Sequence, residues 1–374
     1  MTGRAAAFAP AHAPRLVVKI GSSLLVGGDG AVRRDWLASV LADVAARIAA
    51  GQQVVIVSSG AIALGARRLG LAKGGRASLD DAQAAAATGQ IVLARTYAEL
   101  FEAHGLTAAQ ILLTLGDLED RRRYLNVAAT LDRLLTLRAV PVLNENDSVA
   151  TAEIRFGDND RLAARSAQAA SASAVILLSD IDGLYTANPA RDASATLIDT
   201  VANIDAVASA AEARSGSGLG SGGMAAKVVA ARIAVQAGMP LAIVDGRPDH
   251  PLARFDATGH GTIFVADGGA RPRKAWLAGR LTVAGRLTVD AGAAAALRSG
   301  ASLLAAGVVA VEGSFTRGDA VDISVGEIVI ARGLVAYDAV DVTRIAGQRS
   351  DAHAVRLGYA PRAAVIHRDQ LVMV

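Results

Sequence analysis

The chain has 374 residues, more than one hydrophobic core usually supports, so two domains are expected. Hydrophobic residues make up 52% of it but aromatic residues only 3%, which indicates Ala-rich helices packed over Val- and Ile-rich strands. A formal net charge of +3 creates no large positive field and disfavours nucleic acid as the main partner, while the lack of cysteine excludes disulfides and thiol nucleophiles.

The first residues, Met1–Pro14, lack the apolar stretch of a signal peptide, and we predict a disordered tail there. Apolar runs such as Ala174–Leu178 stop well short of the ~20 residues that a membrane span needs. We therefore expect a cytoplasmic protein that has no membrane partner.

Short apolar strands alternate with helical stretches between residues 15 and 265. The predicted strands are Leu16–Ile20, Val54–Val57, Ala109–Leu113, Val140–Leu143, Ala174–Leu178 and Pro240–Val244. The predicted helices are Asp35–Ala50, Leu79–His104, Arg121–Arg138, Asp160–Ala170 and Met224–Ala237. This alternation predicts an α/β domain with a mainly parallel sheet sandwiched by helices, whose ligands lie beyond the carboxyl ends of the strands.

The composition changes near Ala266. Residues 266–277 are polar, basic and contain Gly and Pro, which indicates a linker. Residues 278–374 then alternate closely spaced strands with one short helix, which predicts a small β-rich second domain. Its predicted elements are Leu281–Val283, Leu287–Val289, Ala291–Ser299 (the helix), Val308–Val311, Ala320–Ile323 and Glu327–Ala331.

Two turns with small residues follow the first two strands. In the first, Lys19 precedes Gly21 and Ser22; glycine lets the backbone approach an anion and lysine supplies a point charge, although a surface lysine beside an ordinary turn has the same pattern. In the second, Ser59 and Gly60 precede a helix whose free N–H groups suit an anion. Taken alone, this second turn is explained by simple helix capping.

Two polar clusters, Asn144–Asp147 and Gly157–Asp160, follow the fourth predicted strand. So many polar groups cannot all be buried without partners. Their carboxylates and amides suit recognition of an amine-bearing substrate or the organisation of lysines. Loop solvation is the alternative, and Asp160 is also placed to cap the helix that starts at Arg161.

A glycine-rich run, Ser215–Lys227, ends in a lysine about one turn inside a predicted helix. Its Gly218–Gly223 portion satisfies the dinucleotide-binding fingerprint, with Asp245 about 20 residues further on. That fingerprint must follow a strand directly, however, and Ala206–Arg214 has the pattern of a helix. We therefore predict a phosphate-covering loop with a cation on the following helix, and a plain linker is the alternative.

Two lysines, two small-residue turns, the polar clusters and a glycine-rich loop together predict phosphoryl transfer. That reaction needs in-line placement and neutralised charge more than covalent help from the protein. The six histidines show neither metal-ligand spacing nor a nucleophile–base arrangement, so no protein metal site is predicted.

Six motifs in chain order carry a specific resemblance. They are LVVKIGSSLL (Leu16–Leu25), VVIVSSGAIALG (Val54–Gly65), PVLNENDSVATAE (Pro141–Glu153), GDNDRL (Gly157–Leu162), LSDIDGLYT (Leu178–Thr186) and GLGSGGMAAK (Gly218–Lys227). The set resembles the amino-acid kinase family, and within it the bacterial enzymes that phosphorylate the γ-carboxylate of L-glutamate. The stretch Arg286–Tyr337 is similar to the PUA domain that many of those enzymes carry.

The resemblance implies roles for individual residues. Lys19 and Lys227 would be catalytic and hold the ATP phosphates, and Asp160 would orient both. The glutamate site would consist of Ser59, Gly60, Asn146, Asp147 and Asn159. The ATP site would consist of Lys19, Gly21, Ser22, Ser179, Asp180, Ser221, Gly222, Gly223, Met224, Ala225, Ala226 and Lys227.

The resemblance also implies γ-glutamyl phosphate as the product, the first intermediate of proline synthesis, with Mg²⁺ accompanying ATP. It implies feedback inhibition by proline, a homo-oligomer and hand-off of the product to glutamyl phosphate reductase. Three positions depart from the pattern: Ser179 and Ser221 stand where threonine is common, and Ala226 where a threonine often precedes the lysine. Ala226 loses a hydroxyl, which puts a side-chain contact at that position in doubt.

Three other functions compete with this one. A sibling enzyme would phosphorylate acetylglutamate, aspartate or carbamate instead. An NAD-dependent oxidoreductase would use Gly218–Gly223 and Asp245. An RNA-binding protein would use the second domain, because PUA domains elsewhere bind RNA, but Ala278–Val374 has 10 Arg against 9 acidic residues and therefore no dense basic face.

Overall fold

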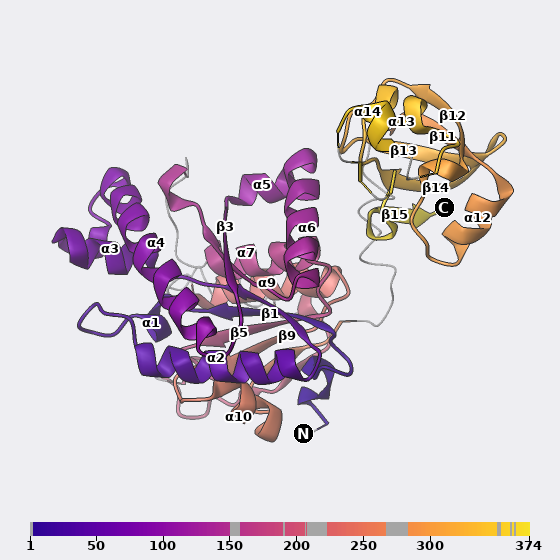
Figure 1. Ribbon diagram of the computed structural model, residues 1–374. Coiled ribbons are helices and arrows are strands. Elements are labelled where there is room, and N and C mark those ends of the chain that lie inside the picture. Colours follow the sequence, from indigo (N-terminus) through magenta and orange to yellow (C-terminus); the bar gives the residue numbers. More distant parts are fainter. Residues whose placement is uncertain are drawn as a thin grey trace. The chain divides into compact units, whose positions relative to one another are not determined.

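The computed structural model describes residues 3–149, 158–189, 191–205, 207, 223–266, 283–349, 353–359, 361–362 and 364–374. The chain forms two compact units (Figure 1). One contains Met1–Glu119 and Val127–Gly268, and the other contains Asp120–Asn126 and Gly269–Val374. The last boundary between the units falls between Gly268 and Gly269. Most of the linker predicted at residues 266–277 lies outside the described residues, so its structure stays a prediction.

The first unit is built on an eight-stranded sheet whose order, within the described residues, is β3-β4-β2-β1-β5-β9-β10-β8. All six predicted strands lie side by side in it and are parallel, and β10 is antiparallel to β9. The bounds are β1 Arg15–Ile20, β2 Gln53–Val57, β3 Ala108–Leu113, β4 Val140–Glu145, β5 Ala174–Ser179, β8 Thr200–Val201, β9 Leu241–Asp245 and β10 Thr262–Phe264. A separate pair joins β6 Leu184–Tyr185 to β7 Leu197–Ile198.

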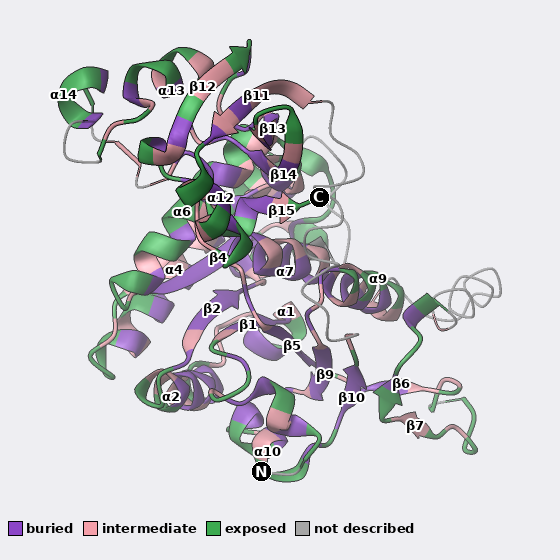
Figure 2. Cartoon of the chain, turned by 90° about the vertical axis from the view of Figure 1, so that its right-hand side faces the viewer, coloured by how far each residue is buried: buried purple, intermediate pink, exposed green. Residues whose placement is uncertain are grey.

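Helices cover both faces of this sheet, with α2 and α10 on one face and α7 and α9 on the other (Figure 1). The strands β1, β2, β5 and β9 are consequently buried over almost their whole length (Figure 2), which is why their sequences are continuous apolar runs. The predicted sandwich is confirmed.

The described helices before residue 269 have the following bounds: α1 Ser22–Leu25, α2 Arg34–Ala49, α3 Ala61–Leu69, α4 Leu79–Glu102, α5 Leu115–Glu119, α6 Arg121–Thr136, α7 Asp158–Ala169, α9 Gly223–Gln236 and α10 Pro251–Thr258. Three short 3-10 turns accompany them: η1 Ala5–Phe8, η2 Ala72–Gly75 and η3 Asp147–Val149.

Two glycines bring α3 and α4 into backbone contact. A Cβ atom on Gly65 would lie 1.8 Å from the carbonyl oxygen of Ala85, and one on Gly89 would lie 1.8 Å from that of Ala61. No real side chain fits at such distances, so both positions require glycine. This contact fixes α3, the helix that follows the Ser59–Gly60 turn.

The predicted disordered tail, residues 1–14, is wrong from Gly3 onward. Phe8 is fully buried, and its ring packs edge-on against Phe255 with the centroids 5.5 Å apart. The carbonyl oxygen of Phe8 accepts hydrogen bonds from Arg47 and Gln52, each at 3.0 Å. The partners lie on distant elements of the chain, so the local sequence gave no sign of this anchoring.

The second unit contains a five-stranded sheet of order β12-β11-β13-β14-β15, as its strand-rich sequence predicted. Two strands predicted at Leu281–Val283 and Leu287–Val289 are one continuous strand from Val283, because Gly285 does not interrupt it. A Cβ atom on Gly285 would lie 2.5 Å from the carbonyl oxygen of Glu312, so this glycine serves close packing. The elements are β11 Val283–Val289, α12 Ala291–Arg298, η4 Ala305–Gly307, β12 Val308–Gly313, β13 Ala320–Val325, β14 Ile328–Leu334, α13 Ala339–Ile345, α14 His353–Leu357, η6 Arg368–Gln370 and β15 Leu371–Met373.

Among the described helices, none combines the length and the apolar character needed to cross a membrane.

The buried N-terminal segment gives a first testable prediction. Replacing Phe8 by alanine removes a fully buried ring, so we expect the free energy of unfolding of the first unit to fall by about 3–5 kcal/mol in urea titrations. His12, exposed in the same segment, is the matched control, and His12→Ala should change the free energy by less than about 0.5 kcal/mol. Equal stability of Phe8→Ala and the native protein would show that the segment contributes nothing.

Candidate active site

The predicted site residues gather at the carboxyl ends of four adjacent strands, β4, β2, β1 and β5 (Figure 1). Lys19 stands level with Val57 of β2 and Leu177 of β5, so the turns after these three strands begin at the same height. The N-terminal parts of α7 and α9 complete the site with Asp160 and Lys227. The parallel sheet therefore joins motifs that lie far apart in the sequence.

A carboxylate between two lysines forms the centre of the site. The Oδ1 atom of Asp160 lies 2.6 Å from Nζ of Lys19, and its Oδ2 atom lies 3.0 Å from Nζ of Lys227. The Asp160 side chain is 1% exposed and the two lysine side chains 8% and 9%. The three side chains together carry two ammonium groups and one carboxylate, a net positive charge that suits an anionic ligand. The carboxylate of Asp180 also attracts Lys19, more weakly than Asp160 does.

Burial and charge oppose each other in this cluster. Burial lowers the pKa of Lys19, against the attraction of Asp160, which favours the charged ammonium. Burial alone would raise the pKa of Asp160, but the adjacent ammonium groups of Lys19 and Lys227 outweigh it and hold that pKa below its ordinary value. Asp160 is therefore an ionised anchor for the two lysines and does not serve as a proton acceptor.

The Gly21–Ser22 turn borders the ammonium group of Lys19. A Cβ atom on Gly21 would lie 3.8 Å from Nζ of Lys19 and 3.7 Å from the carbonyl oxygen of Leu178. A side chain at position 21 would thus occupy the space beside this charge. The glycine keeps that space open for a ligand.

The second turn places a hydroxyl in the site. The sequence alone allowed this turn to be explained by helix capping, but Ser59 does not cap α3. Gly60 directly precedes the helix, and no side-chain cap hydrogen bond is present there. The hydroxyl of Ser59 accepts a hydrogen bond of 2.8 Å from Nδ2 of Asn159. Gly60 has a φ of +99°, and a Cβ atom there would lie 3.1 Å from Val26, so conformation and space both call for glycine.

A network of amides holds Asn159 in place. Its Nδ2 atom donates a second hydrogen bond of 3.1 Å to Oδ1 of Asn144, whose own Nδ2 donates to Oε1 of Gln90 at 2.8 Å. Oδ1 of Asn159 is buried and has no hydrogen-bond partner among the described residues. This oxygen is therefore an acceptor available to a ligand donor such as an ammonium group.

Asn146 and Asp147 follow β4 and are half-buried. The backbone N–H of Asn146 donates to the carbonyl oxygen of Leu113 at 2.8 Å, which ties this segment to β3. Asp147 begins the η3 turn. Both residues thus lie at the strand edge that carries Ser59 and Asn159.

Sequence reasoning missed Gln90 and Tyr97 on α4. The hydroxyl of Tyr97 lies 3.0 Å from Oγ of Ser58, one residue before Ser59, and burial raises the pKa of Tyr97. Both residues sit in an Ala-rich helix whose pattern indicated only core packing. Their partners are 54 and 39 residues away, so no local signal distinguishes them.

The predicted nucleotide residues other than Lys19, Gly21 and Ser22 begin at β5, on the side of β1 away from β2. Ser179 ends β5, is buried, and donates a hydrogen bond of 3.3 Å from its hydroxyl to Oδ1 of Asp180. Further residues of this set form the first turn of α9, with Lys227 directly after them; these are Gly223, Met224, Ala225 and Ala226. Ser221 and Gly222 lie outside the described residues.

The dinucleotide alternative depended on Asp245. This residue does end β9, but both its carboxylate oxygens accept hydrogen bonds from Arg247, at 2.8 and 2.9 Å. The carboxylate is therefore already engaged. Most of the glycine fingerprint, residues 218–222, lies outside the described residues.

The central carboxylate gives a prediction with a pH dependence. Asp160→Asn leaves two buried ammonium groups without a counter-charge, so we expect the free energy of unfolding to fall by about 3–5 kcal/mol at pH 7. The pKa of Lys19, already lowered by burial, falls further in this variant. Because the unfolded chain then binds more protons than the folded one, the variant regains stability as the pH rises towards ~10.4.

Urea titrations at pH 7 and pH 9 measure this effect. Asp205→Asn is the control, because Asp205 pairs with Arg232 on the surface and its side chain is 66% exposed. If Asp160→Asn lowered the free energy of unfolding by the same amount at both pH values, the proposed charge balance would be contradicted.

Comparison with known proteins shows the family of this chain. Residues 14–245 match the amino acid kinase family, and residues 285–354 match the PUA domain. The chain is 65% identical to a protein of Sphingopyxis alaskensis named glutamate 5-kinase, over 98% of this chain and 99% of that protein.

Two further relatives bear the same name. One, from Novosphingobium aromaticivorans, is 61% identical over 96% of each chain. The other, from Zymomonas mobilis, is 60% identical over 98% of this chain and 93% of its own. Since the family match spans more than half of the chain and these relatives align with nearly all of it, the chain belongs to the amino acid kinase family and carries a PUA domain after its kinase domain.

Proposed function

We propose that this protein transfers the γ-phosphate of ATP to the side-chain carboxylate of L-glutamate. The observation that carries the proposal is the buried Asp160 carboxylate between the ammonium groups of Lys19 and Lys227. The names of relatives that are 60–65% identical over nearly the whole chain support glutamate as the acceptor.

The chemistry requires little covalent help from the protein. A glutamate side-chain oxygen attacks the γ-phosphorus of ATP, the bond from that phosphorus to the bridging oxygen breaks, and ADP leaves with the electron pair. The attacking carboxylate is already ionised at neutral pH, so no general base is needed. This agrees with an Asp160 that is ionised and engaged by two lysines.

Lys19 and Lys227 would stabilise the negative charge on the moving phosphoryl group. Asp160 fixes their ammonium groups in place, so little reorganisation is needed as the charge shifts. The N–H groups of the Gly21–Ser22 turn would assist beside Lys19. Ser179, Asp180 and the glycine-rich residues 221–227 would bind the rest of the nucleotide.

The glutamate itself would lie on the Ser59 side of the cluster. The buried Oδ1 atom of Asn159 can accept a hydrogen bond from the substrate ammonium group. Asp147 would add a negative charge for the same group, with Asn146 and Gly60 next to it. The amide network behind Asn159 holds this acceptor in a single orientation.

Mg²⁺ would enter with ATP, because phosphate oxygens are ligands that it prefers. Within the described part of the chain, no group of three acidic or histidine side chains comes together to bind a metal ion. When bound, the ion would neutralise charge on the phosphates. We assign no protein ligand to it.

The wider setting of the reaction forms part of the same proposal. The product, γ-glutamyl phosphate, is a reactive acyl phosphate and would be passed to glutamyl phosphate reductase in proline synthesis. Feedback inhibition by proline, a homo-oligomeric assembly and a cytoplasmic location complete the proposal. Sibling enzymes of this family that act on acetylglutamate, aspartate or carbamate define the competing substrates to test.

Trapping with hydroxylamine tests the acceptor. The protein is incubated with ATP, Mg²⁺ and each candidate acid, and we expect a hydroxamate from free L-glutamate at a rate well above those from acetylglutamate and aspartate. Lys227→Ala serves as the inactive control. A protein that forms hydroxamate only from another acid, or none from L-glutamate, would refute the proposal.

Steady-state kinetics test the residue roles. Lys19→Ala and Lys227→Ala should each lower kcat by roughly 10²–10³-fold with a smaller effect on the glutamate KM, since both act on the moving phosphoryl group. Asp147→Ala should instead raise mainly the glutamate KM and leave the ATP KM unchanged. An unchanged kcat in Lys227→Ala would contradict the role of this lysine.

A further inference from the structure

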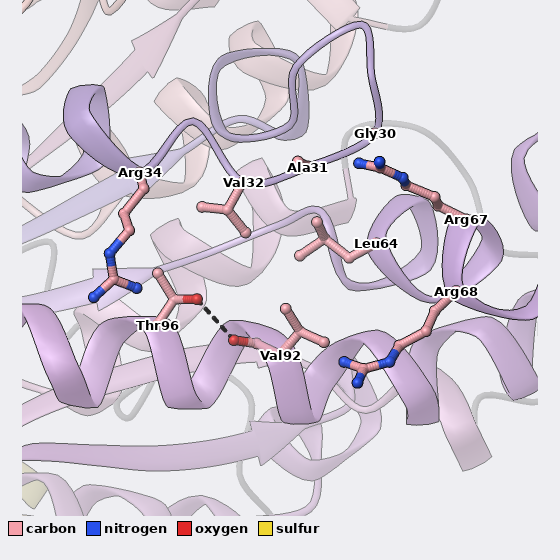
Figure 3. A pocket seen from close by; sticks show the side chains of 9 residues that line it. All are labelled: Gly30, Ala31, Val32, Arg34, Leu64, Arg67, Arg68, Val92 and Thr96. Atoms are coloured by element: carbon pink, nitrogen blue, oxygen red, sulfur yellow. Dashed lines mark hydrogen bonds between the residues drawn. The ribbon is translucent and has the colours of Figure 1, made fainter.

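A pocket of about 410 Å³ lies in the first unit, between α3, α4 and the hairpin that leads into α2 (Figure 3). Such a volume falls within the range typical of small-molecule sites. None of its lining residues belongs to the proposed active site. They are Gly30, Ala31, Val32, Arg34, Leu64, Arg67, Arg68, Val92 and Thr96.

The pocket has an apolar centre and a cationic rim. Val32, Leu64 and Val92 lie in the middle, between Arg34 on one side and the arginines of α3 on the other (Figure 3). Thr96 lies beside Arg34, with its hydroxyl donating to the carbonyl oxygen of Val92 at 2.9 Å. An apolar floor with a few charged groups at its edge is typical of a site for an amphiphilic ligand.

The three arginines at the edge of the pocket differ in how far acidic side chains neutralise their charge. Arg34 forms a 2.8 Å ion pair with Glu99. Arg67 reaches Asp29 only at 3.9 Å, and Arg68 has no ion-pair or hydrogen-bond partner among the described residues. The unbalanced charge therefore lies at the Arg67–Arg68 end of the pocket.

The pocket wall that carries this charge is held in position. The Arg67 stem packs against the hairpin, where a Cβ atom on Gly30 would lie 2.9 Å from its Cδ atom. The backbone contact between Gly65 and Gly89 fixes α3 against α4. The backbone that carries Arg67 and Arg68 is therefore closely packed against both the hairpin and α4.

The helix dipole accounts for only part of this arrangement. Arg67 and Arg68 occupy the last turn of α3, where a positive charge is favoured in any helix. That preference explains neither the pocket nor its apolar floor. Two arginines at the edge of an apolar pocket indicate a ligand with an anionic head and an apolar body.

The geometry points to a second binding site in this pocket, for a small organic anion. Its anionic group, a phosphate ester or a carboxylate, is bound by the guanidinium groups of Arg67 and Arg68. Its apolar portion rests on Val32, Leu64 and Val92. The site is separate from the proposed active site and does not depend on the identity of the phosphoryl acceptor.

Fluorescence titration with 1-naphthyl phosphate tests this site in the full-length protein. The active site is first filled with L-glutamate and a non-hydrolysable ATP analogue. We expect 1-naphthyl phosphate to bind at least about tenfold more tightly than 1-naphthol or inorganic phosphate, because only it satisfies both halves of the pocket. A companion titration with 1-naphthoate distinguishes a phosphate site from a carboxylate site.

Variants locate the binding. Arg67→Leu/Arg68→Leu should weaken 1-naphthyl phosphate binding by about tenfold or more, and Val92→Ser should weaken it without affecting inorganic phosphate. Arg254→Leu is the matched control, because Arg254 is an exposed arginine on α10 outside the pocket, and it should bind like the native protein. Lys227→Ala should also retain binding.

Three results would overturn the inference. One is the absence of saturable binding in the native protein. Another is equal binding in the native protein and the Arg67→Leu/Arg68→Leu variant. The third is loss of binding in Lys227→Ala, which would place the probe in the active site instead.

Discussion

The buried carboxylate of Asp160 is the interaction on which the rest of this active site depends. Burying two ammonium groups without a counter-charge would cost several kcal/mol, and a single carboxylate with one oxygen directed at each lysine removes most of that cost. The arrangement does not cancel the charge completely. One positive charge remains in a site screened from water, where it acts on a transferring phosphoryl group more strongly than an exposed lysine would.

The fold makes this arrangement by bringing three separate elements to one edge of a sheet. Lys19 is placed by a central strand, whereas Asp160 and Lys227 come from α7 and α9, which cover the same face. The side of the site proposed for glutamate depends on a hydrogen-bond network of amide side chains. Asn159 is oriented by Asn144 of β4, which is itself held by Gln90 of α4, and its buried Oδ1 atom has no hydrogen-bond partner among the described residues.

The helix pair α3 and α4 links the active site to the rest of the kinase domain. The glycine contact at Gly65 and Gly89 fixes the helix that follows the Ser59–Gly60 turn, and Tyr97 of α4 contacts Ser58 in the same turn. The proposed anion pocket lies on these two helices as well. A ligand there would therefore contact the same closely packed helices that position the proposed substrate turn.

The sequence by itself determined the alternation of strands and helices, the parallel sheet, the second β-rich domain and the residues of the Lys–Asp–Lys cluster. Those features follow from local hydrophobic patterns and from short motifs, which are read within a few residues. The tertiary structure alone decided the burial of Phe8, the roles of Gln90 and Tyr97 and the charged rim of the pocket. Each of these depends on contacts between residues far apart in the chain, such as Gln90 with Asn144, 54 residues away. Packing selects such partners, and no local pattern encodes them.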